Sequence, residues 1–447
     1  MTAPLARSEH LVVVGASLAG LRAVEAARRL GFTGQITLIG QESHLPYDRP
    51  PLSKAFLDSD GDKSALPFRS EHEFADDLQV RLLLGHPATG LDAATHTVMV
   101  NGRAVAYDKL IITTGATPRS LPMTLPGAAS CGVHNLRTIE DAVAIREALD
   151  RRARVVIVGA GFIGSEVAAA ARKRGLPVTI IERLSTPLVR SVGPAVGSIV
   201  AELHERAGTE LVLDAGITEI TAQDGHATGV VLHDGRRLDA ELIVVGIGAS
   251  PATEWLSGSG IELHPVDGGL VCGPDLATNL PDVFAAGDVV HAPNSLFDND
   301  TVRLEHWTNA AEQGVLAARS ALGHRSNEAP ANVPYFWSDL YAARIQFVGL
   351  PTADEVLPVG LDTDAPIVLY RRSDRIVGAL TVNRPRDIMK FRRRIADRGL
   401  WAESVQFADE LAAALRASQP DSRSLSSGAR FTVPSTAEKL DHGRTLR

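Results

Sequence analysis

Three glycines and a later acid form the clearest chemical motif in the chain. Gly159, Gly161 and Gly164 lie between a short apolar run and an alanine-rich segment, and Glu182 ends the next apolar run. Glycines at this spacing turn the chain sharply and let backbone amides approach a pyrophosphate at a helix N-terminus. A carboxylate at position 182 can accept hydrogen bonds from both ribose hydroxyls and would repel a 2′-phosphate, so the motif predicts NAD in preference to NADP. The adjacent Arg183 weakens that preference.

A second copy of this motif lies near the start of the chain. Gly15, Ser17 and Gly20 keep the spacing, with serine in place of the middle glycine. The next apolar run is followed by Gln41 and Glu42, so the ribose partner is either the amide of Gln41 or the carboxylate of Glu42. Two such motifs in one chain predict two nucleotide sites.

Each motif lies in a strand–helix–strand pattern, which is the unit of a doubly wound parallel sheet. The first unit has a strand from His10, a helix over 21–30 and a strand over 35–40, and the second has a strand from Arg154, a helix to Arg174 and a strand over 178–182. Further strands are predicted over 109–114, 241–249 and 280–290, with a helix over 308–322. From residue 333 the pattern changes to separated strands over 344–349, 367–371 and 376–381 and then a basic helix, which indicates an additional α+β domain.

Composition excludes several functional classes. A net charge of -8 and a pI near 6.0 argue against nucleic-acid binding, which needs a basic surface. The two cysteines, Cys131 and Cys272, form no C-x-x-C pair, so redox chemistry needs a bound cofactor rather than a dithiol, and no metal site is predicted. The first residues do not resemble a secretory signal, and no apolar run is long enough for a membrane span. We expect a soluble, cytoplasmic protein.

Several further motifs, taken together, resemble one family. They are R-P-P-L-S-K at 49–54, T-T-G-A-T-P-R at 113–119, F-A-A-G-D at 284–288, E-H-W-T-N-A at 305–310, F-W-S-D at 336–339 and V-N-R-P-R-D at 382–387. Over roughly residues 10–410 the chain resembles the FAD-dependent NADH:ferredoxin reductases of the putidaredoxin reductase type, which serve cytochrome P450 and Rieske oxygenase systems. Rubredoxin reductases, monodehydroascorbate reductases and apoptosis-inducing-factor-like proteins share the cofactor motifs.

The resemblance implies an α/β fold with two Rossmann-like dinucleotide-binding domains in a glutathione-reductase-like arrangement and a C-terminal α+β domain. The implied boundaries are 1–115 with 251–328 for a discontinuous FAD-binding domain, 116–250 for the NAD-binding domain, 329–415 for the C-terminal interface domain and 416–447 for a flexible tail.

The resemblance also implies which residues bind each cofactor. Gly15, Ser17, Ala19 and Gly20 are expected at the FAD pyrophosphate, and Asp288 at its ribityl chain. The full FAD set is Gly15, Ser17, Ala19, Gly20, Gln41 or Glu42, Arg49, Lys54, Ala88, Thr114, Gly115, Arg137, Asp288, Glu305, His306 and Trp307. The NAD set is Gly159, Gly161, Phe162, Ile163, Gly164, Glu166, Glu182, Arg190, Gly246, Ile247 and Gly248.

Four residues are expected at the redox centre. Lys54 follows the rigid Pro50–Pro51 turn and would place a cation beside the flavin, and Glu166 would orient the nicotinamide and pair with Lys54. Trp307 and Trp337 would border the isoalloxazine ring. Hydride transfer needs no general base, so we interpret His306 as a packing or hydrogen-bonding residue.

The implied activity is hydride uptake from NADH and single-electron delivery to a [2Fe-2S] ferredoxin. A basic face in the C-terminal domain would steer this acidic partner: Arg384, Arg386, Lys390, Arg392, Arg393 and Arg394, with Arg303 as a further candidate. Two alternatives remain: a reductase of another acceptor such as rubredoxin, a quinone or the ascorbate radical, and an NADH-sensing flavoprotein like the apoptosis-inducing factors. No nucleic-acid or membrane partner is expected.

Overall fold

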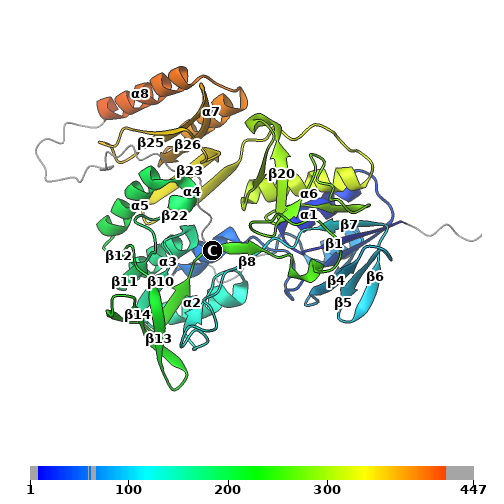
Figure 1. Cartoon of the computed structure of the whole chain (residues 1–447), viewed down its shortest axis with the longest axis horizontal. Coiled ribbons are helices and arrows are strands. Elements are labelled where there is room, and N and C mark those ends of the chain that lie inside the picture. Colours follow the sequence, from blue (N-terminus) through cyan, green and yellow to red (C-terminus); the bar gives the residue numbers. More distant parts are fainter. Residues whose placement is uncertain (1–8, 59, 62–66, 419–447) are drawn as a thin grey trace, which may run out of the picture.

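The computed structural model describes residues 9–58, 60–61 and 67–418. Its two α/β units lie side by side, and a third region covers one end of the pair (Figure 1). Within the described residues, no helix is long and apolar enough to cross a membrane. The architecture confirms the predicted α/β class with an additional C-terminal α+β region.

The first unit is built on a five-stranded parallel sheet in the order β19-β7-β1-β2-β3. Its strands are β1 (His10–Val14), β2 (Gln35–Ile39), β3 (Val80–Leu83), β7 (Lys109–Ile112) and β19 (Val283–Ala285). Strand β19 comes from far along the chain, so the unit is discontinuous in sequence. Its two long helices, α1 (Leu18–Arg29) and α6 (Trp307–Ala321), pack against each other. The strand predicted over 280–290 is limited to three residues because Gly287 turns the chain with a φ of 85°.

The second unit repeats this plan. Its parallel sheet has the order β12-β11-β10-β16-β9. The strands are β9 (Val133–His134), β10 (Val155–Val158), β11 (Val178–Ile181), β12 (Glu210–Val212) and β16 (Leu242–Val245). The helices are α2 (Ile139–Asp150), α3 (Phe162–Lys173), α4 (Val189–Val192) and α5 (Pro194–Arg206).

Four smaller sheets flank the two units within the described residues; three are antiparallel, and the fourth has one parallel and one antiparallel pairing. The strands β8 (Ala116–Pro118) and β17 (Ala249–Pro251) pair where the chain passes between the units (Figure 1). The first unit adds β4 (Ala88–Asp92), β5 (Thr97–Val100), β6 (Arg103–Ala106), β18 (Leu270–Val271), β20 (Val290–Asn294) and β21 (Asp300–Arg303), and the second adds β13 (Ile217–Gln223), β14 (His226–Leu232) and β15 (Arg237–Asp239). A 3-10 turn over Pro50–Ser53 precedes Lys54.

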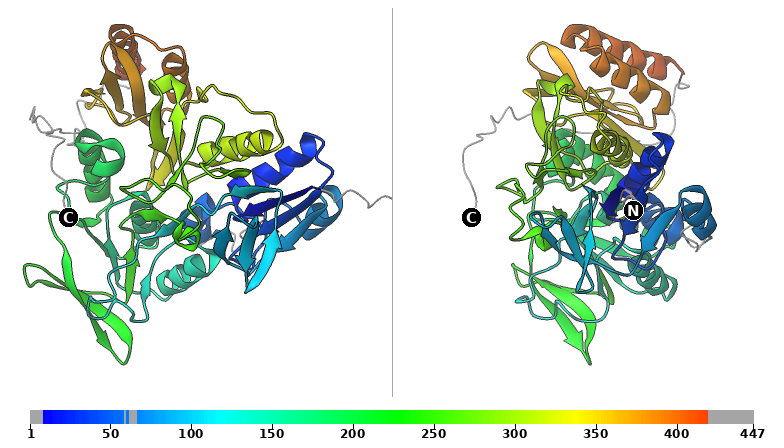
Figure 2. Two further views of the ribbon diagram at one scale, coloured as in Figure 1. Left: turned by 45° about the vertical axis from the view of Figure 1, so that its right-hand side comes forward. Right: turned by 90° about the vertical axis from the view of Figure 1, so that its right-hand side faces the viewer.

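The C-terminal region is an antiparallel sheet in the order β22-β23-β26-β25-β24 with two helices (Figure 2). Its strands are β22 (Tyr335–Leu340), β23 (Ala343–Gly349), β24 (Glu355–Val359), β25 (Ile367–Arg372) and β26 (Arg375–Val382), and its helices are α7 (Pro385–Ala396) and α8 (Trp401–Ser418). Of the tail predicted over 416–447, residues 416–418 end α8 and the rest lies outside the described residues.

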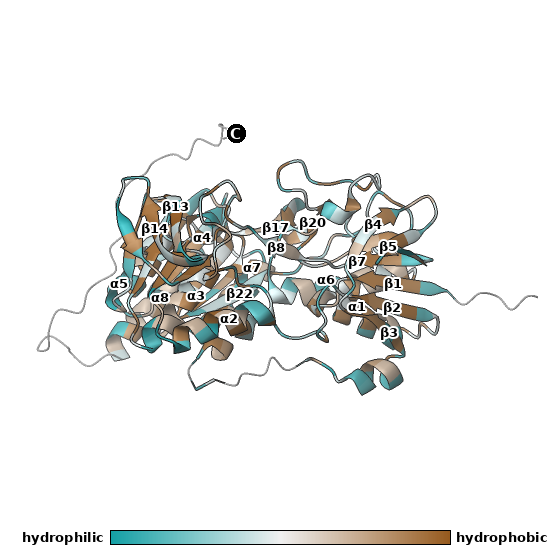
Figure 3. Ribbon diagram, turned by 90° about the horizontal axis from the view of Figure 1, so that it is seen from below, coloured by the Kyte–Doolittle hydropathy of each residue, from teal (hydrophilic) through white to brown (hydrophobic). Residues whose placement is uncertain are grey.

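Apolar side chains concentrate in the sheets. Figure 3 shows brown, hydrophobic strands inside both units and teal, hydrophilic segments along the outer surfaces of the helices. All five residues of β1 are buried, as expected for a strand covered on both faces. The sheets are therefore rigid supports, and the loops at their carboxyl ends carry the chemistry.

Helices α1 and α6 approach closely at one glycine. A Cβ atom on Gly314 would lie 2.3 Å from the backbone oxygen of Ala19. This glycine therefore sets how near α6 can come to the motif at the start of α1.

Gly314→Ala should lower the free energy of unfolding by about 2 kcal/mol, because the new methyl group forces the two helices apart. Urea unfolding at constant FAD concentration measures this change. The control is Gly90→Ala, whose Cβ would lie 3.6 Å from its nearest neighbour, Met99 Cγ, and which should change stability far less. Equal stability of the two variants would contradict the tight packing.

Candidate functional site

A single cavity of about 1620 Å³ runs between the two units and reaches the C-terminal region. It lies at the carboxyl ends of β1 and β10, where ligands bind to sheets of this kind. Almost all the predicted site residues line it. They are Gly15, Ser17, Ala19, Gln41, Glu42, Arg49, Lys54, Ala88, Thr114, Gly115, Arg137, Gly159, Gly161, Phe162, Ile163, Glu166, Glu182, Arg190, Gly246, Ile247, Gly248, Asp288, Glu305, His306, Trp307 and Trp337.

The third glycine of each motif is needed for packing. Gly20 and Gly164 do not line the cavity. A Cβ on Gly20 would lie 2.1 Å from Gly15 O, and one on Gly164 would lie 2.4 Å from Gly159 O. Both glycines let the helix pack against the preceding turn, and their contact with a cofactor stays a prediction.

The start of α1 is open to an anion. Ser17 is its N-cap, and its hydroxyl makes no capping hydrogen bond within the described part of the chain. Gly15 has a φ of 121°, and a Cβ there would lie 2.1 Å from Thr113 O. Only glycine fits this turn, which leaves the first-turn amides of α1 facing the cavity.

The Glu42 carboxylate already accepts hydrogen bonds from neighbouring side chains. Its carboxylate accepts hydrogen bonds from Arg49 Nη2 at 2.5 Å and from Tyr47 OH at 2.5 Å. Arg49 also donates to the backbone oxygen of Arg137 at 2.8 Å and to Ser17 Oγ at 3.3 Å. Arg49 therefore connects the glycine turn to the loop that carries Arg137.

Asp288 is a largely enclosed carboxylate, 18% exposed, in need of donors. Arg137 Nη2 lies 3.5 Å from its Oδ2, and burial raises the pKa of Asp288. A buried carboxylate is stable when hydroxyl or amide donors reach it. The hydroxyls of a ribityl chain are such donors, so this residue fits FAD on the side of the cavity formed by the first unit.

A network around Glu166 joins all three parts of the molecule. Glu166 lies on α3, is 4% exposed, and pairs with Lys54 Nζ at 2.8 Å, as predicted. Its Oε1 also accepts from Ser338 Oγ at 2.6 Å, and its Oε2 accepts from Ser53 Oγ. Ser53 precedes Lys54, and Ser338 comes from β22 in the C-terminal sheet.

The sequence motifs contained both serines, but their roles were missed. Ser53 stands in R-P-P-L-S-K and Ser338 in F-W-S-D, each next to a residue that was predicted to act. A serine beside a candidate lysine or tryptophan has no distinctive pattern of its own.

Two tryptophans border the cavity from different elements. Trp307, at the start of α6, donates its indole N–H to Asp48 Oδ1 at 2.8 Å. Trp337, on β22, stacks on Tyr335 with ring centroids 5.7 Å apart. Both rings are fixed by neighbours, which suits a flat apolar wall for a ring system.

His306 has the surroundings of a packing residue. It is the N-cap of α6, and its ring lies 5.0 Å from the ring of Phe336. Burial lowers the pKa of His306 to about 4, so the imidazole is neutral at physiological pH. Phe336, which also contacts Phe162 and Phe347, was missed as the centre of this aromatic cluster.

The second unit presents a similar turn. Glu182 accepts hydrogen bonds from the backbone amides of Ala160 at 2.8 Å and Leu184 at 2.9 Å. These bonds fix its carboxylate at the rim of the cavity, which it lines. Helix α3 begins after Gly161, which has no side chain to cap the first-turn amides. These features fit a second dinucleotide beside the first.

Two basic residues predicted for docking are internal. Arg303 is 14% exposed and donates to Asp267, Glu305 and the backbone oxygen of Asp288. Arg384 is 8% exposed and donates to the backbone oxygens of Ala365 and Leu411 and to Asp387. Both arginines satisfy neighbouring acceptors, so their assignment to a docking face is corrected.

The remaining basic residues lie on α7. Arg386, Lys390 and Arg393 are spaced by four and three residues and are exposed, which places them on one helix face, here called the α7 basic stripe. Lys390 pairs with Asp387 at 2.8 Å and Arg393 with Asp397 at 3.5 Å. Arg392 points toward Glu312 of α6 at 4.0 Å, and Arg394 lies over the ring of Phe407 at 4.2 Å.

Two Rossmann-like units whose helix-start turns face one cavity define a nucleotide-dependent oxidoreductase with a cofactor site in each unit. The family model described as pyridine nucleotide-disulphide oxidoreductase matches residues 9–314, and the model described as reductase C-terminal matches residues 335–418. The chain belongs to the pyridine nucleotide-disulphide oxidoreductase family, and its cofactors are FAD and NAD(H). Its two cysteines are both free, so it contains no redox disulfide.

The relatives differ in the electron acceptor that their names state. The chain is 37% identical to a rubredoxin-NAD(+) reductase from Pseudomonas putida over 84% of this chain and 96% of the relative. It is similar to the ferredoxin reductase for the CYP199A2 system from Rhodopseudomonas palustris, with a TM-score of 0.82, 32% identity and coverage of 92% and 100%. It is also similar to a covalent putidaredoxin reductase-putidaredoxin complex, with a TM-score of 0.81, 32% identity and coverage of 87% and 93%.

His306 should make stability depend on pH. Its pKa is near 6.5 when unfolded and about 4 when folded, so the unfolded state binds the proton first as the pH falls. Stability is complete above the unfolded pKa, and about 2 kcal/mol should be lost between about pH 7 and about pH 5. Urea unfolding of FAD-loaded protein measures this loss.

His306→Gln should remove that part of the slope, whereas His324→Gln, an exposed control, should keep it. An unchanged slope in His306→Gln would mean that folding does not lower the pKa of this imidazole.

Proposed function

We propose that the protein takes electrons from NADH and delivers them singly to a [2Fe-2S] ferredoxin that serves a cytochrome P450 or Rieske oxygenase. The observation that carries the proposal is the Lys54–Glu166 pair, at 2.8 Å, where the two nucleotide-binding units meet. Bound together, the cofactors supply two-electron uptake from the nicotinamide and one-electron release from the flavin. The absence of a dithiol in the chain agrees with a one-electron acceptor.

The residues around the junction hold the reacting rings in place. Glu166 would orient the nicotinamide carboxamide, and Lys54 would hold positive charge where the reduced flavin gains electron density. Ser53 and Ser338 donate to the Glu166 carboxylate and keep it in position. Trp307 and Trp337 would exclude water from the ring faces, and the amides at the start of α6 would face the flavin.

The individual cofactor assignments follow from the contacts. Gln41 is the better partner for the FAD ribose, because Arg49 and Tyr47 already occupy the Glu42 carboxylate. Arg137 and Asp288 would lie along the ribityl and pyrophosphate part. We retain 1–115 with 251–328 for the FAD-binding domain, 116–250 for the NAD-binding domain and 329–415 for the interface domain.

Rubredoxin is the second candidate acceptor, because a relative with 37% identity is named for it. Steady-state reduction of a [2Fe-2S] ferredoxin, a rubredoxin and a quinone by NADH and the FAD-loaded protein decides between them. The proposal expects kcat/KM for the ferredoxin to exceed the other values by at least about tenfold. Turnover of none of them would favour the NADH-sensing interpretation.

NADH should be preferred to NADPH, because Glu182 at the rim attracts the ribose diol and repels a 2′-phosphate. Glu182→Ala should reduce the ratio of the two kcat/KM values by roughly tenfold, which corresponds to about 1.4 kcal/mol. Glu219→Ala, an exposed position in the same unit, is the control and should leave the ratio unchanged. Equal kcat/KM values in the unmodified protein would refute the role of Glu182.

The α7 basic stripe should govern docking of the ferredoxin. Arg386→Glu with Arg393→Glu should raise the KM for the ferredoxin about tenfold at low salt and flatten its salt dependence, because steering acts on association. Ferricyanide reduction, which needs no docking face, should be unchanged.

The matched control reverses two exposed charges of the second unit, Arg151→Glu with Arg236→Glu. It has the same change in net charge and should keep the ferredoxin KM. Equal effects of the two double variants would show that net charge, and not the stripe, sets the KM.

A further inference from the structure

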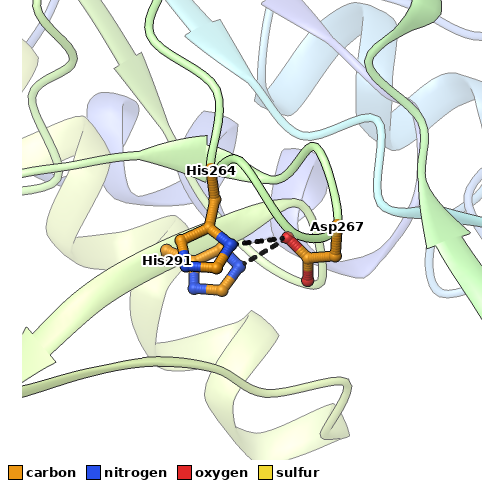
Figure 4. Close-up of side chains that lie close together, drawn as sticks. All are labelled: His264, Asp267 and His291. Carbon is orange, nitrogen blue, oxygen red and sulfur yellow. Dashed lines mark hydrogen bonds and ion pairs between the residues drawn. The ribbon is translucent and has the colours of Figure 1, made fainter. Parts of the chain in front are cut away.

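Two histidines and an aspartate meet outside the cofactor cavity. His264, Asp267 and His291 each offer one ligand atom, and these atoms lie within 4.8 Å of one another (Figure 4). Asp267 Oδ1 is 2.8 Å from His291 Nε2 and 3.3 Å from His264 Nδ1. None of the three residues lines the cavity, so the cofactor site does not account for the cluster.

The local backbone brings these side chains together. The turn from His264 to Gly269 is closed by a hydrogen bond from His264 N to Gly269 O at 2.7 Å and one from Gly268 N to His264 O at 2.8 Å. His291 lies on β20, which pairs with β18 just after the turn. A Cβ on Gly269 would lie 2.7 Å from His291 Cδ2, so the glycine makes room for that ring.

The imidazole nitrogens are incompletely satisfied. His264 Nδ1 is buried and faces the carboxylate, but it has no hydrogen-bond partner within the described part of the chain. The two imidazole rings stack with centroids 4.0 Å apart. In the tautomer protonated at Nε2, this nitrogen carries a lone pair that can bind a ligand.

We propose that His264, Asp267 and His291 bind one divalent transition-metal ion of the zinc type, with water in the fourth position. Zinc bonds of about 2.0–2.1 Å place tetrahedral ligand atoms about 3.3 Å apart. The Asp267 Oδ1–His264 Nδ1 separation of 3.3 Å matches this value, and the Asp267 Oδ1–His291 Nε2 separation of 2.8 Å would lengthen when the ion replaces their hydrogen bond. The separation between the ligand nitrogens of His264 and His291 shortens when the His264 side chain, which is 33% exposed, turns toward His291. Two nitrogen ligands favour zinc, nickel or copper over magnesium or calcium, which prefer oxygen.

Hydrogen bonds through Arg303 connect the proposed metal site to the cofactor cavity. Asp267 Oδ2 accepts from Arg303 Nε at 2.7 Å, and Arg303 Nη1 donates to Glu305 at 2.7 Å and to the backbone oxygen of Asp288 at 2.9 Å. Both acceptors line the cavity. The positive charge of Arg303 opposes that of the metal, so we expect affinity on the order of micromolar.

The test is equilibrium dialysis of the FAD-loaded, untagged full chain against Zn²⁺, with bound zinc counted by mass spectrometry. The unmodified protein should take up one ion per chain. His264→Gln with His291→Gln should abolish this uptake, and His264→Gln alone, which changes a partly exposed residue, should weaken it at least about tenfold. His324→Gln, an exposed histidine elsewhere, is the control and should bind normally.

Electron paramagnetic resonance of added Cu²⁺ gives a second readout, because coupling to two imidazole nitrogens identifies the ligands. The circular dichroism and flavin absorbance of each variant establish that it is folded. Failure of the unmodified protein to bind Zn²⁺, or equal binding by the double variant, would overturn the proposal. Coupling to fewer than two nitrogens would also overturn it.

Discussion

The structure depends on how one buried carboxylate is satisfied. Glu166 is almost fully enclosed, and an ionised group in such a place is stable only when donors surround it. Its three donors are Ser53, Lys54 and Ser338, which come from the first unit and the C-terminal sheet, whereas Glu166 itself comes from the second unit. Moving any of the three parts would take at least one of these donors away from the buried carboxylate. The carboxylate therefore fixes their mutual positions as well as the geometry of the redox centre.

The two units place their nucleotides by the same physical means. In each unit a buried parallel strand ends in a glycine turn, and a helix begins with amides that no side chain caps. The cavity joins the two turns, so dinucleotides that bind to them approach each other near Glu166 and Lys54. The antiparallel β8–β17 pair connects the units at this junction and limits how far they can separate. Binding geometry thus follows from sheet topology, and reactivity follows from the few charged side chains between the sheets.

Local sequence patterns predicted the secondary structure and the types of domain better than they predicted the surroundings of individual side chains. Both strand–helix–strand units and the additional α+β region are present, because periodicity and glycine spacing are properties of short segments. The surroundings of Arg303 and Arg384 were not predicted, because they depend on contacts with residues outside the local segment. Arg384, for example, belongs to a basic segment, yet its guanidinium is buried against Ala365 and Leu411. Ser338 was missed for the same reason, since its partner Glu166 lies 172 residues away.

Under the proposed function, the C-terminal region would link acceptor docking to the redox centre. Its sheet contributes Ser338 and Trp337 to the cavity on β22, and α7 packs on the same sheet through Ile388, Phe391 and Ile395. Because one hydrophobic core holds both, the α7 basic stripe has a fixed position relative to the Glu166 network. An acidic protein that docks on the stripe is therefore placed at a constant distance from the site where electrons leave. Changes in the exposed residues of α7 can alter the choice of partner without disturbing the buried face that anchors the helix.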